Sequence, residues 1–230
     1  MTHLALFDLD HTLLAGDSDY LWGRFLVERG LVDADAYERQ NQIFYDQYRA
    51  GTLDIESFCQ FSFAPLAAHP LQRLLDWRQA FVAEKILPVI APQARALLQH
   101  HRDRGEHLAI VTATNRFITE PVAAHLGVDT LIATEPEFVD GRYTGRLAGV
   151  ANFRQGKVQR LEQWLSDSGV QPGQIRFYSD SHNDLPLLER ADRPVAVDPD
   201  DTLREVARQR QWPIISLRGS TLEIPAALEP

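Results

Sequence analysis

Two aspartates, Asp8 and Asp10, directly follow a short apolar run over residues 4–7. The run is too short to span a membrane and has the length expected of a strand buried on both faces. In open α/β sheets, ligands bind just beyond the carboxyl ends of the strands. Because unpaired buried carboxylates cost several kcal/mol, two of them at a strand end indicate a functional site. The alternative is an Asp-rich turn that closes the strand.

Polar side chains also follow two later apolar runs. Thr112 and Thr114 end the first of these runs, and Asp180 and Asp184 follow the second; Lys157 precedes a predicted helix between them. If these strand ends are neighbours in a parallel sheet, the carboxylates meet one lysine and several hydroxyls. Like charges a few ångströms apart repel and need a cation, and a set of oxygen ligands suits Mg²⁺.

An aspartate in such a cluster can act as a nucleophile and form an aspartyl-phosphate. Thr112 and Lys157 would then bind the phosphoryl oxygens and stabilise the charge of the transition state. The residues therefore predict phosphoryl-transfer chemistry at this site.

The order of these residues resembles the four motifs of the haloacid dehalogenase-like phosphohydrolase superfamily. The resemblance covers essentially the whole chain and rests on Asp8-x-Asp10-x-Thr12, Thr112, Lys157 and Asp180-Ser-His-Asn183-Asp184. The helical segment between the first two motifs resembles the cap of the phosphoserine phosphatase-like branch, to which histidinol-phosphate phosphatases are similar.

The resemblance implies a role for each motif residue. Asp8 would be the nucleophile and a Mg²⁺ ligand, and Asp10 the general acid and base, with its main-chain carbonyl on the metal. Asp180 would complete the metal shell, supported by Asp184. True dehalogenases lack the second aspartate, so Asp10 indicates phosphate chemistry. The residues expected to contact substrate are Thr12, Asp17, Ala113, Thr114 and Asn183.

The substrate stays open between alternatives. Asp17 lies seven positions after Asp10, where phosphoserine phosphatases carry an acidic residue that binds the substrate's amino group. Asp17 and its neighbour Asp19 could equally be helix N-cap residues. Thr112-Ala113-Thr114-Asn115 replaces the glycine-rich stretch of phosphoserine phosphatases, which counts against phosphoserine. Similarity to histidinol-phosphate phosphatases keeps histidinol phosphate, another amine-bearing phosphomonoester, as the second candidate. A phosphotransferase with the same intermediate and a non-enzymatic, phosphate-accepting receiver-like protein are the alternative functions.

The elements that must position these residues follow from apolar spacing. Residues 17–87 show helical spacing in four stretches, which predicts a helical cap over residues 16–87, inserted into an α/β core made of residues 1–15 and 88–230. From Pro88 onward strands and helices alternate, as in a doubly wound, mainly parallel sheet. A β-hairpin is expected over residues 137–144 with Asp140-Gly141 as its turn, a late helix capped by Asp201, and a terminal tail rich in Pro and Glu.

Composition limits the function classes. The chain has 230 residues and a formal charge of −9, which argues against a nucleic-acid or anionic-membrane surface. Cys59 is the only cysteine, so neither disulfides nor a cysteine metal site is expected. The sequence shows no signal peptide and no transmembrane run. We expect a cytoplasmic protein, and its oligomeric state stays open.

Overall fold

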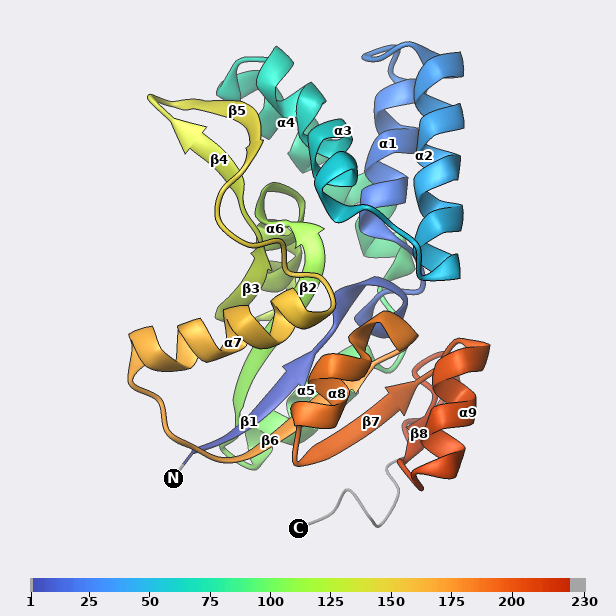
Figure 1. Cartoon of the computed structure of the whole chain (residues 1–230), viewed down its shortest axis with the longest axis vertical. Coiled ribbons are helices and arrows are strands. Elements are labelled where there is room, and N and C mark those ends of the chain that lie inside the picture. Colours follow the sequence, from blue (N-terminus) through green and yellow to red (C-terminus); the bar gives the residue numbers. More distant parts are fainter. Residues whose placement is uncertain (1, 224–230) are drawn as a thin grey trace.

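The computed structural model describes residues 2–223 and contains a six-stranded sheet in the order β3-β2-β1-β6-β7-β8 (Figure 1). All neighbouring strands pair in parallel. The strands are β1 (Thr2–Phe7), β2 (His107–Asn115), β3 (Thr130–Thr134), β6 (Pro172–Ser179), β7 (Arg193–Val197) and β8 (Ile214–Ile215). The α/β class with a mainly parallel sheet is therefore confirmed.

Helices cover both faces of this sheet. They are α5 (Ala94–Asp103), α6 (Arg116–Leu126), α7 (Gln155–Ser168), α8 (Leu185–Arg190) and α9 (Asp201–Gln209). Ala5 and Phe7 of β1 pack in one apolar core with α5 and α6. Leu4 and Leu6 pack in the other with α7, α8 and α9. Figure 1 shows α7 and α8 in front of the sheet and α5 behind it. Burial on both faces explains why the strands are continuous apolar runs.

Between β1 and α5, the chain forms a group of helices beyond the carboxyl ends of the strands (Figure 1). They are α1 (Ser18–Glu28), α2 (Ala34–Ala50), α3 (Ile55–Ala68) and α4 (Leu71–Phe81), followed by irregular helical turns over Val82–Ile86 and Leu87–Val89. α1 and α4 share a core with the sheet domain, because the Trp22 ring packs 5.1 Å from Phe81 and 5.9 Å from Phe117 of α6. A cap over residues 16–87 that moves as a unit stays a prediction.

A β-hairpin made of β4 (Pro136–Val139) and β5 (Arg142–Leu147) leaves the sheet after β3. Asp140 has φ 50° and Gly141 has φ 79°, as a type I′ turn requires and as the sequence predicted. Figure 1 shows the hairpin beside α3 and α4, and a Cβ at Gly145 would lie only 3.2 Å from that of Ala67. The hairpin thus packs against the helical segment, although the sequence boundaries assign it to the core.

The start of α9 differs from the sequence prediction. The helix cap predicted at Asp201 is wrong: Asp200 accepts the main-chain N–H of Leu203 at 2.7 Å, and Asp201 is the first helical residue. Most of the predicted terminal tail, residues 224–230, lies outside the described residues. Within residues 2–223, no helix combines the length and the apolar character needed to cross a membrane.

Candidate active site

After β1 the chain stays extended through Asp8 and then forms a wide turn, which places Asp8 and Asp10 at the carboxyl end of the sheet. The Asp8 N–H donates to the Tyr178 carbonyl at 2.9 Å, which fixes Asp8 beside β6. The next residues form a wide turn, in which His11 has a left-handed φ of 54°. The Arg218 guanidinium stabilises this turn by donating to the carbonyl of His11 at 2.6 Å and to that of Leu14 at 2.9 Å. Sequence reasoning missed Arg218, which lies more than 200 residues away along the chain.

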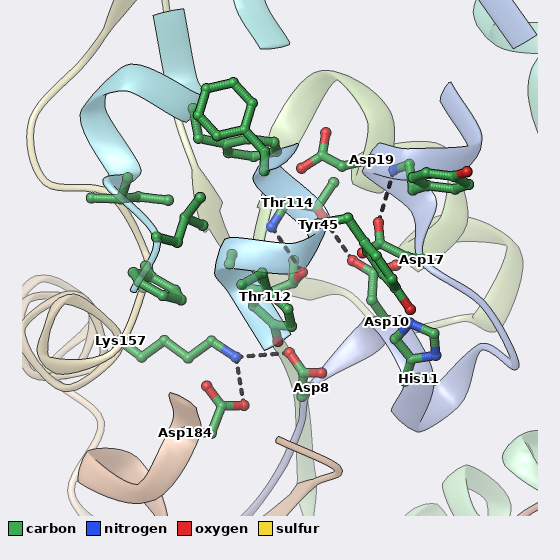
Figure 2. A pocket seen from close by; sticks show the side chains of 18 of the residues that line it. Asp8, Asp10, His11, Asp17, Asp19, Tyr45, Thr112, Thr114, Lys157 and Asp184 are labelled. Carbon is green, nitrogen blue, oxygen red and sulfur yellow. Dashed lines mark hydrogen bonds and ion pairs between the residues drawn. The ribbon is translucent and has the colours of Figure 1, made fainter. Parts of the chain in front are cut away.

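A buried ion cluster lies at the ends of β1 and β6. Lys157 Nζ lies 2.7 Å from both Asp8 Oδ1 and Asp184 Oδ2 (Figure 2), and the Ser179 hydroxyl donates to Asp184 Oδ2 at 2.7 Å. Burial alone would lower the pKa of Lys157, but the carboxylates of Asp184 and Asp8 raise it above its usual value. Burial raises the pKa of Asp8 to about 7, with Lys157 opposing and Asp184 reinforcing the shift. Lys157 is therefore charged, and its positive charge faces two carboxylates.

Gly156, the second residue of α7, and Asn152, before the helix, fix the position of Lys157. A side chain at Gly156 would bring a Cβ to within 2.0 Å of the Ala151 carbonyl, so only glycine permits this close approach. Asn152 is fully buried and donates from Nδ2 to the carbonyls of Thr112 and Ile132, both at 2.8 Å. The loop before Lys157 is thereby attached to the end of β2. Sequence reasoning missed Asn152 because nothing local in the sequence shows which strand it bonds.

Asp180 joins this cluster through a hydroxyl. Thr12 Oγ1 lies 3.3 Å from Asp8 Oδ2 and 3.1 Å from Asp180 Oδ1, and its single proton can serve only one of them at a time. Burial, followed by the charges of Asp8 and Asp184, raises the pKa of Asp180 well above its usual value. The cluster thus holds more carboxylates than its one lysine can neutralise.

The donor set fits a hard divalent cation. Within the described part of the chain, no group of three or more His, Cys, Asp or Glu side chains could hold a metal ion by itself. Mg²⁺ does not require such a cage, since it binds one or two carboxylates together with waters and a substrate phosphate. Asp8 and Asp180 offer two such carboxylates; burial is the main cause of their raised pKa values, and the neighbouring carboxylate charges, which a cation would offset, raise them further.

Asp10 is held by both of its oxygens. Oδ1 accepts the main-chain N–H of Ser18 at 2.7 Å, and Oδ2 accepts the hydroxyl of Thr114 at 2.7 Å (Figure 2). The Thr112 hydroxyl, two residues earlier on β2, accepts the N–H of Thr114 at 3.2 Å. The end of β2 therefore orients Asp10 and presents Thr112 next to Asp8.

Asp17 can fill both roles that the sequence offered as alternatives, helix cap and substrate ligand. Its Oδ1 accepts the Tyr20 N–H at 2.8 Å and caps α1, and the same carboxyl lines the pocket. Burial, followed by the charge of Asp10, raises the pKa of Asp17 to about 7, against the opposing Tyr20 N–H. A helix cap and a ligand contact are compatible, because the cap uses one carboxylate oxygen and leaves the other available.

One pocket connects these groups (Figure 2). Acidic residues, hydroxyls and Lys157 line its floor and one side, and aromatic and aliphatic side chains from α2, α3 and the loops beside them line the rest. The lining residues are Asp8, Asp10, His11, Asp17, Asp19, Tyr20, Asn41, Phe44, Tyr45, Tyr48, Leu53, Ile55, Phe58, Thr112, Ala113, Thr114, Phe153, Lys157 and Asp184. Sequence reasoning missed Asp19 as a pocket residue, although it is the second residue of a helix whose cap, Asp17, was singled out.

Not every residue predicted to touch substrate lines this pocket. Thr12 is fully buried and bonded to Asp8 and Asp180. The Asn183 amide donates to the carbonyl of Tyr48 at 3.0 Å, which attaches the end of α2 to the core. These bonds give Thr12 and Asn183 a positioning role, and their contact with substrate stays a prediction. Asp180 lines the neighbouring cleft rather than the pocket itself.

Comparisons with known proteins agree with this arrangement. The model of the haloacid dehalogenase-like hydrolase family matches residues 5–189. The chain is 43% identical to a histidinol-phosphatase of Neisseria meningitidis over 95% of this chain and all of that one. It is 30% identical to a phosphoserine phosphatase of Mycobacterium tuberculosis, over 99% of this chain and 76% of that one.

Solved structures show the same fold. A protein of unknown function from Bordetella pertussis superposes with a TM-score of 0.89 at 44% identity, over 94% of this chain and all of that one. A substrate-bound phosphoserine phosphatase superposes with a TM-score of 0.69 at 18% identity, over 96% of this chain and 94% of that one, a likeness of fold alone. The chain therefore belongs to the haloacid dehalogenase-like hydrolase family and is one of its phosphoric monoester hydrolases.

Proposed function

We propose that this enzyme is a Mg²⁺-dependent phosphatase whose substrate carries an amine and no carboxylate, and that histidinol phosphate is that substrate. The observation that carries the proposal is the charge of the pocket wall. Beyond Asp8 and Asp10, Asp17 and Asp19 line the pocket, and Lys157 is the only lysine or arginine among the lining residues that the structure describes. Burial lowers the pKa of His11, so the imidazole adds no positive charge to this wall.

The same wall disfavours phosphoserine. Its carboxylate would need a cationic partner, yet Lys157 is already paired with Asp8 and Asp184. Arg49 and Arg218 line the neighbouring cleft instead. A buried carboxylate without a cation, next to other carboxylates, costs several kcal/mol. An alcohol phosphate with an ammonium group has the opposite charge and pairs with Asp17. The 43% identical relative named histidinol-phosphatase supports the same choice.

In the proposed reaction Asp8 attacks phosphorus, and the bond between phosphorus and the ester oxygen breaks. Asp10 gives its proton to the departing alkoxide, and the alcohol leaves. Water then attacks the phosphorus of the aspartyl-phosphate while Asp10 takes a proton from that water, and inorganic phosphate leaves. Lys157 and the Thr112 hydroxyl stabilise the phosphoryl oxygens. The hydrogen bonds of Ser18 and Thr114 to Asp10 hold its carboxyl beside the reacting oxygen.

The metal would be held by Asp8, Asp180 and the main-chain carbonyl of Asp10. A Mg²⁺ ion there supplies positive charge to the phosphoryl oxygens and offsets the carboxylates. Asp184 stays outside that shell, because its Oδ2 is occupied by Lys157 and Ser179. Its part is to orient the lysine.

Phosphate release from a matched set of substrates tests the proposal. Histidinol phosphate, phosphoserine and p-nitrophenyl phosphate are each incubated with Mg²⁺, with EDTA, and with the Asp17→Asn variant. Asn preserves the cap on α1 and removes the charge. We expect histidinol phosphate to be preferred over phosphoserine at least about 100-fold in kcat/KM, as the cost of an unpaired carboxylate requires. Equal kcat/KM for histidinol phosphate and phosphoserine, or phosphate release that is unchanged in EDTA, contradicts the proposal.

A further inference from the structure

Asp19 lines the pocket but has no part in the proposed phosphoryl chemistry. It belongs to α1, and its Oδ1 accepts the Ser62 hydroxyl of α3 and the Asn115 amide at the end of β2, both at 3.2 Å. Groups from two other elements thus fix one carboxylate oxygen of this α1 residue. Such an arrangement directs the carboxyl into the pocket instead of leaving it free to rotate.

The end of β2 places Asp19 far from the phosphoryl position. Thr112 lies beside Asp8, Thr114 bonds Asp10, and Asn115 bonds Asp19. An extended strand rises about 3.3 Å per residue, so Asn115 lies about 10 Å beyond Thr112. In Figure 2, Asp19 lies at the opposite end of the pocket from Lys157, with Thr114 between them. A substrate whose phosphate is at Asp8 would reach Asp19 with its distal group.

The surroundings of Asp19 select the kind of distal group. Aromatic side chains of α2 and α3 line the pocket, and the Phe44 and Phe58 rings pack 5.4 Å apart. Phe58 lies one helical turn before Ser62, the residue of α3 that bonds Asp19. Burial, followed by the charges of Asp17 and Asp10, raises the pKa of Asp19 well above its usual value. A flat ring that carries an N–H donor suits both features: its faces contact the aromatic side chains, and its N–H would stabilise the charged form of Asp19 that burial and the neighbouring aspartates disfavour.

We propose that Asp19 is the specificity residue that receives the ring N–H of a nitrogen heterocycle at the distal end of the substrate, the imidazole in the case of histidinol phosphate. This inference rests on the proposed function and assigns a second contact to the same substrate. Asp17 binds the ammonium group near the phosphate, and Asp19 binds the ring.

A pair of substrates that differ only in the ring, imidazole in one and phenyl in the other, tests the assignment. Phenylalaninol phosphate keeps the phosphate, the amine and an aromatic ring but lacks the N–H. The ratio of kcat/KM for histidinol phosphate to that for phenylalaninol phosphate is measured for the wild type and for Asp19→Asn. Asn can keep both hydrogen bonds to Ser62 and Asn115 and removes only the charge. We expect the ratio to fall at least tenfold, mainly through KM for histidinol phosphate.

Two further variants complete the design. Asp46→Asn makes the same change at an exposed position on α2, where Asp46 accepts a hydrogen bond from Gln42, and should leave the ratio unchanged. Ser62→Ala removes one hydrogen bond to Asp19 and should lower the ratio by a smaller factor. Thermal unfolding of each variant checks that it folds. If Asp19→Asn fails to fold, the substrate ratio of Ser62→Ala is used in its place.

The outcomes separate this inference from the proposed function. If the wild type hydrolyses histidinol phosphate and the substrate ratio is the same in Asp19→Asn, the role of Asp19 is refuted while the function stands. If the wild type releases no phosphate from histidinol phosphate but does so from p-nitrophenyl phosphate, the proposed function fails and the inference fails with it. A ratio that falls in Asp19→Asn and is unchanged in Asp46→Asn supports the assignment.

Discussion

Replacing Lys157 with methionine tests the buried ion cluster most directly. The ammonium group lies 2.7 Å from both Asp8 and Asp184, and the three side chains are only 3%, 8% and 4% exposed. Methionine preserves much of the volume and removes the charge, so two buried carboxylates face each other without a counter-ion. Removing one partner of a buried ion pair costs about 3–5 kcal/mol. For a protein of this size that equals a fall in Tm of roughly 6–20 °C.

The loss of stability should depend on pH with a definite sign. The pKa of Lys157 is raised, so in the wild type the lysine itself stays charged from pH 5 to pH 8. In Lys157→Met the uncompensated carboxylates can bind protons as the pH falls, because burial already raises the pKa of Asp8 to about 7 with the lysine present. The deficit in free energy of unfolding should therefore be largest at pH 8 and smaller at pH 5.

Urea unfolding in EDTA at both pH values measures this deficit without a metal to offset the charge. The control is Lys85→Met, which breaks an exposed pair of Lys85 and Glu28 at 2.6 Å and should cost less than about 1 kcal/mol. Equal losses in the two variants, or a Lys157 deficit that is the same at pH 5 and pH 8, would refute the reasoning. Phosphatase activity of Lys157→Met, measured with Mg²⁺, should also be lost at both pH values, because the ammonium group that stabilises the phosphoryl oxygens beside the metal is removed.

Three further predictions concern single side chains. Asp8→Asn should lower kcat at least about 1000-fold with the fold preserved, measured by phosphate release and circular dichroism, because the amide is not a nucleophile. Burial lowers the pKa of His101 to about 4, so this group should cost the wild type up to about 3 kcal/mol of stability from pH 6.5 to pH 4, measured as the difference in pH slope between the wild type and His101→Gln. Arg154 donates to the Gly51 carbonyl and, at 3.0 Å, to Asn183; Arg154→Ala should speed hydrogen exchange over residues 48–53 and raise KM several-fold.

Each of these has a distinct contradicting result. More than a few per cent of wild-type activity in Asp8→Asn would argue against a nucleophilic Asp8. The same pH slope in His101→Gln as in the wild type would show that His101 is not the group that binds the proton on unfolding. Unchanged exchange in Arg154→Ala would show that the bonds from Arg154 do not hold the end of α2 to the core.

The sequence determined the class of fold and the composition of the site. Apolar runs that end in polar residues identify buried parallel strands whose carboxyl ends meet, so Asp8, Thr112, Lys157 and Asp184 could be grouped before any coordinates. The helical spacing of residues 17–87 and the Asp140-Gly141 turn were equally local signals. These features depend on residue types and short-range spacing, which the sequence shows directly.

Only the tertiary structure decided which side chains face the pocket. Thr12 and Asn183 lie inside motifs, yet their hydrogen bonds turn them toward Asp8, Asp180 and the end of α2. Asp19 lies outside every motif, yet contacts with α3 and β2 hold it against the pocket. These outcomes depend on bonds between residues distant in sequence, and short-range spacing carries no information about such pairs.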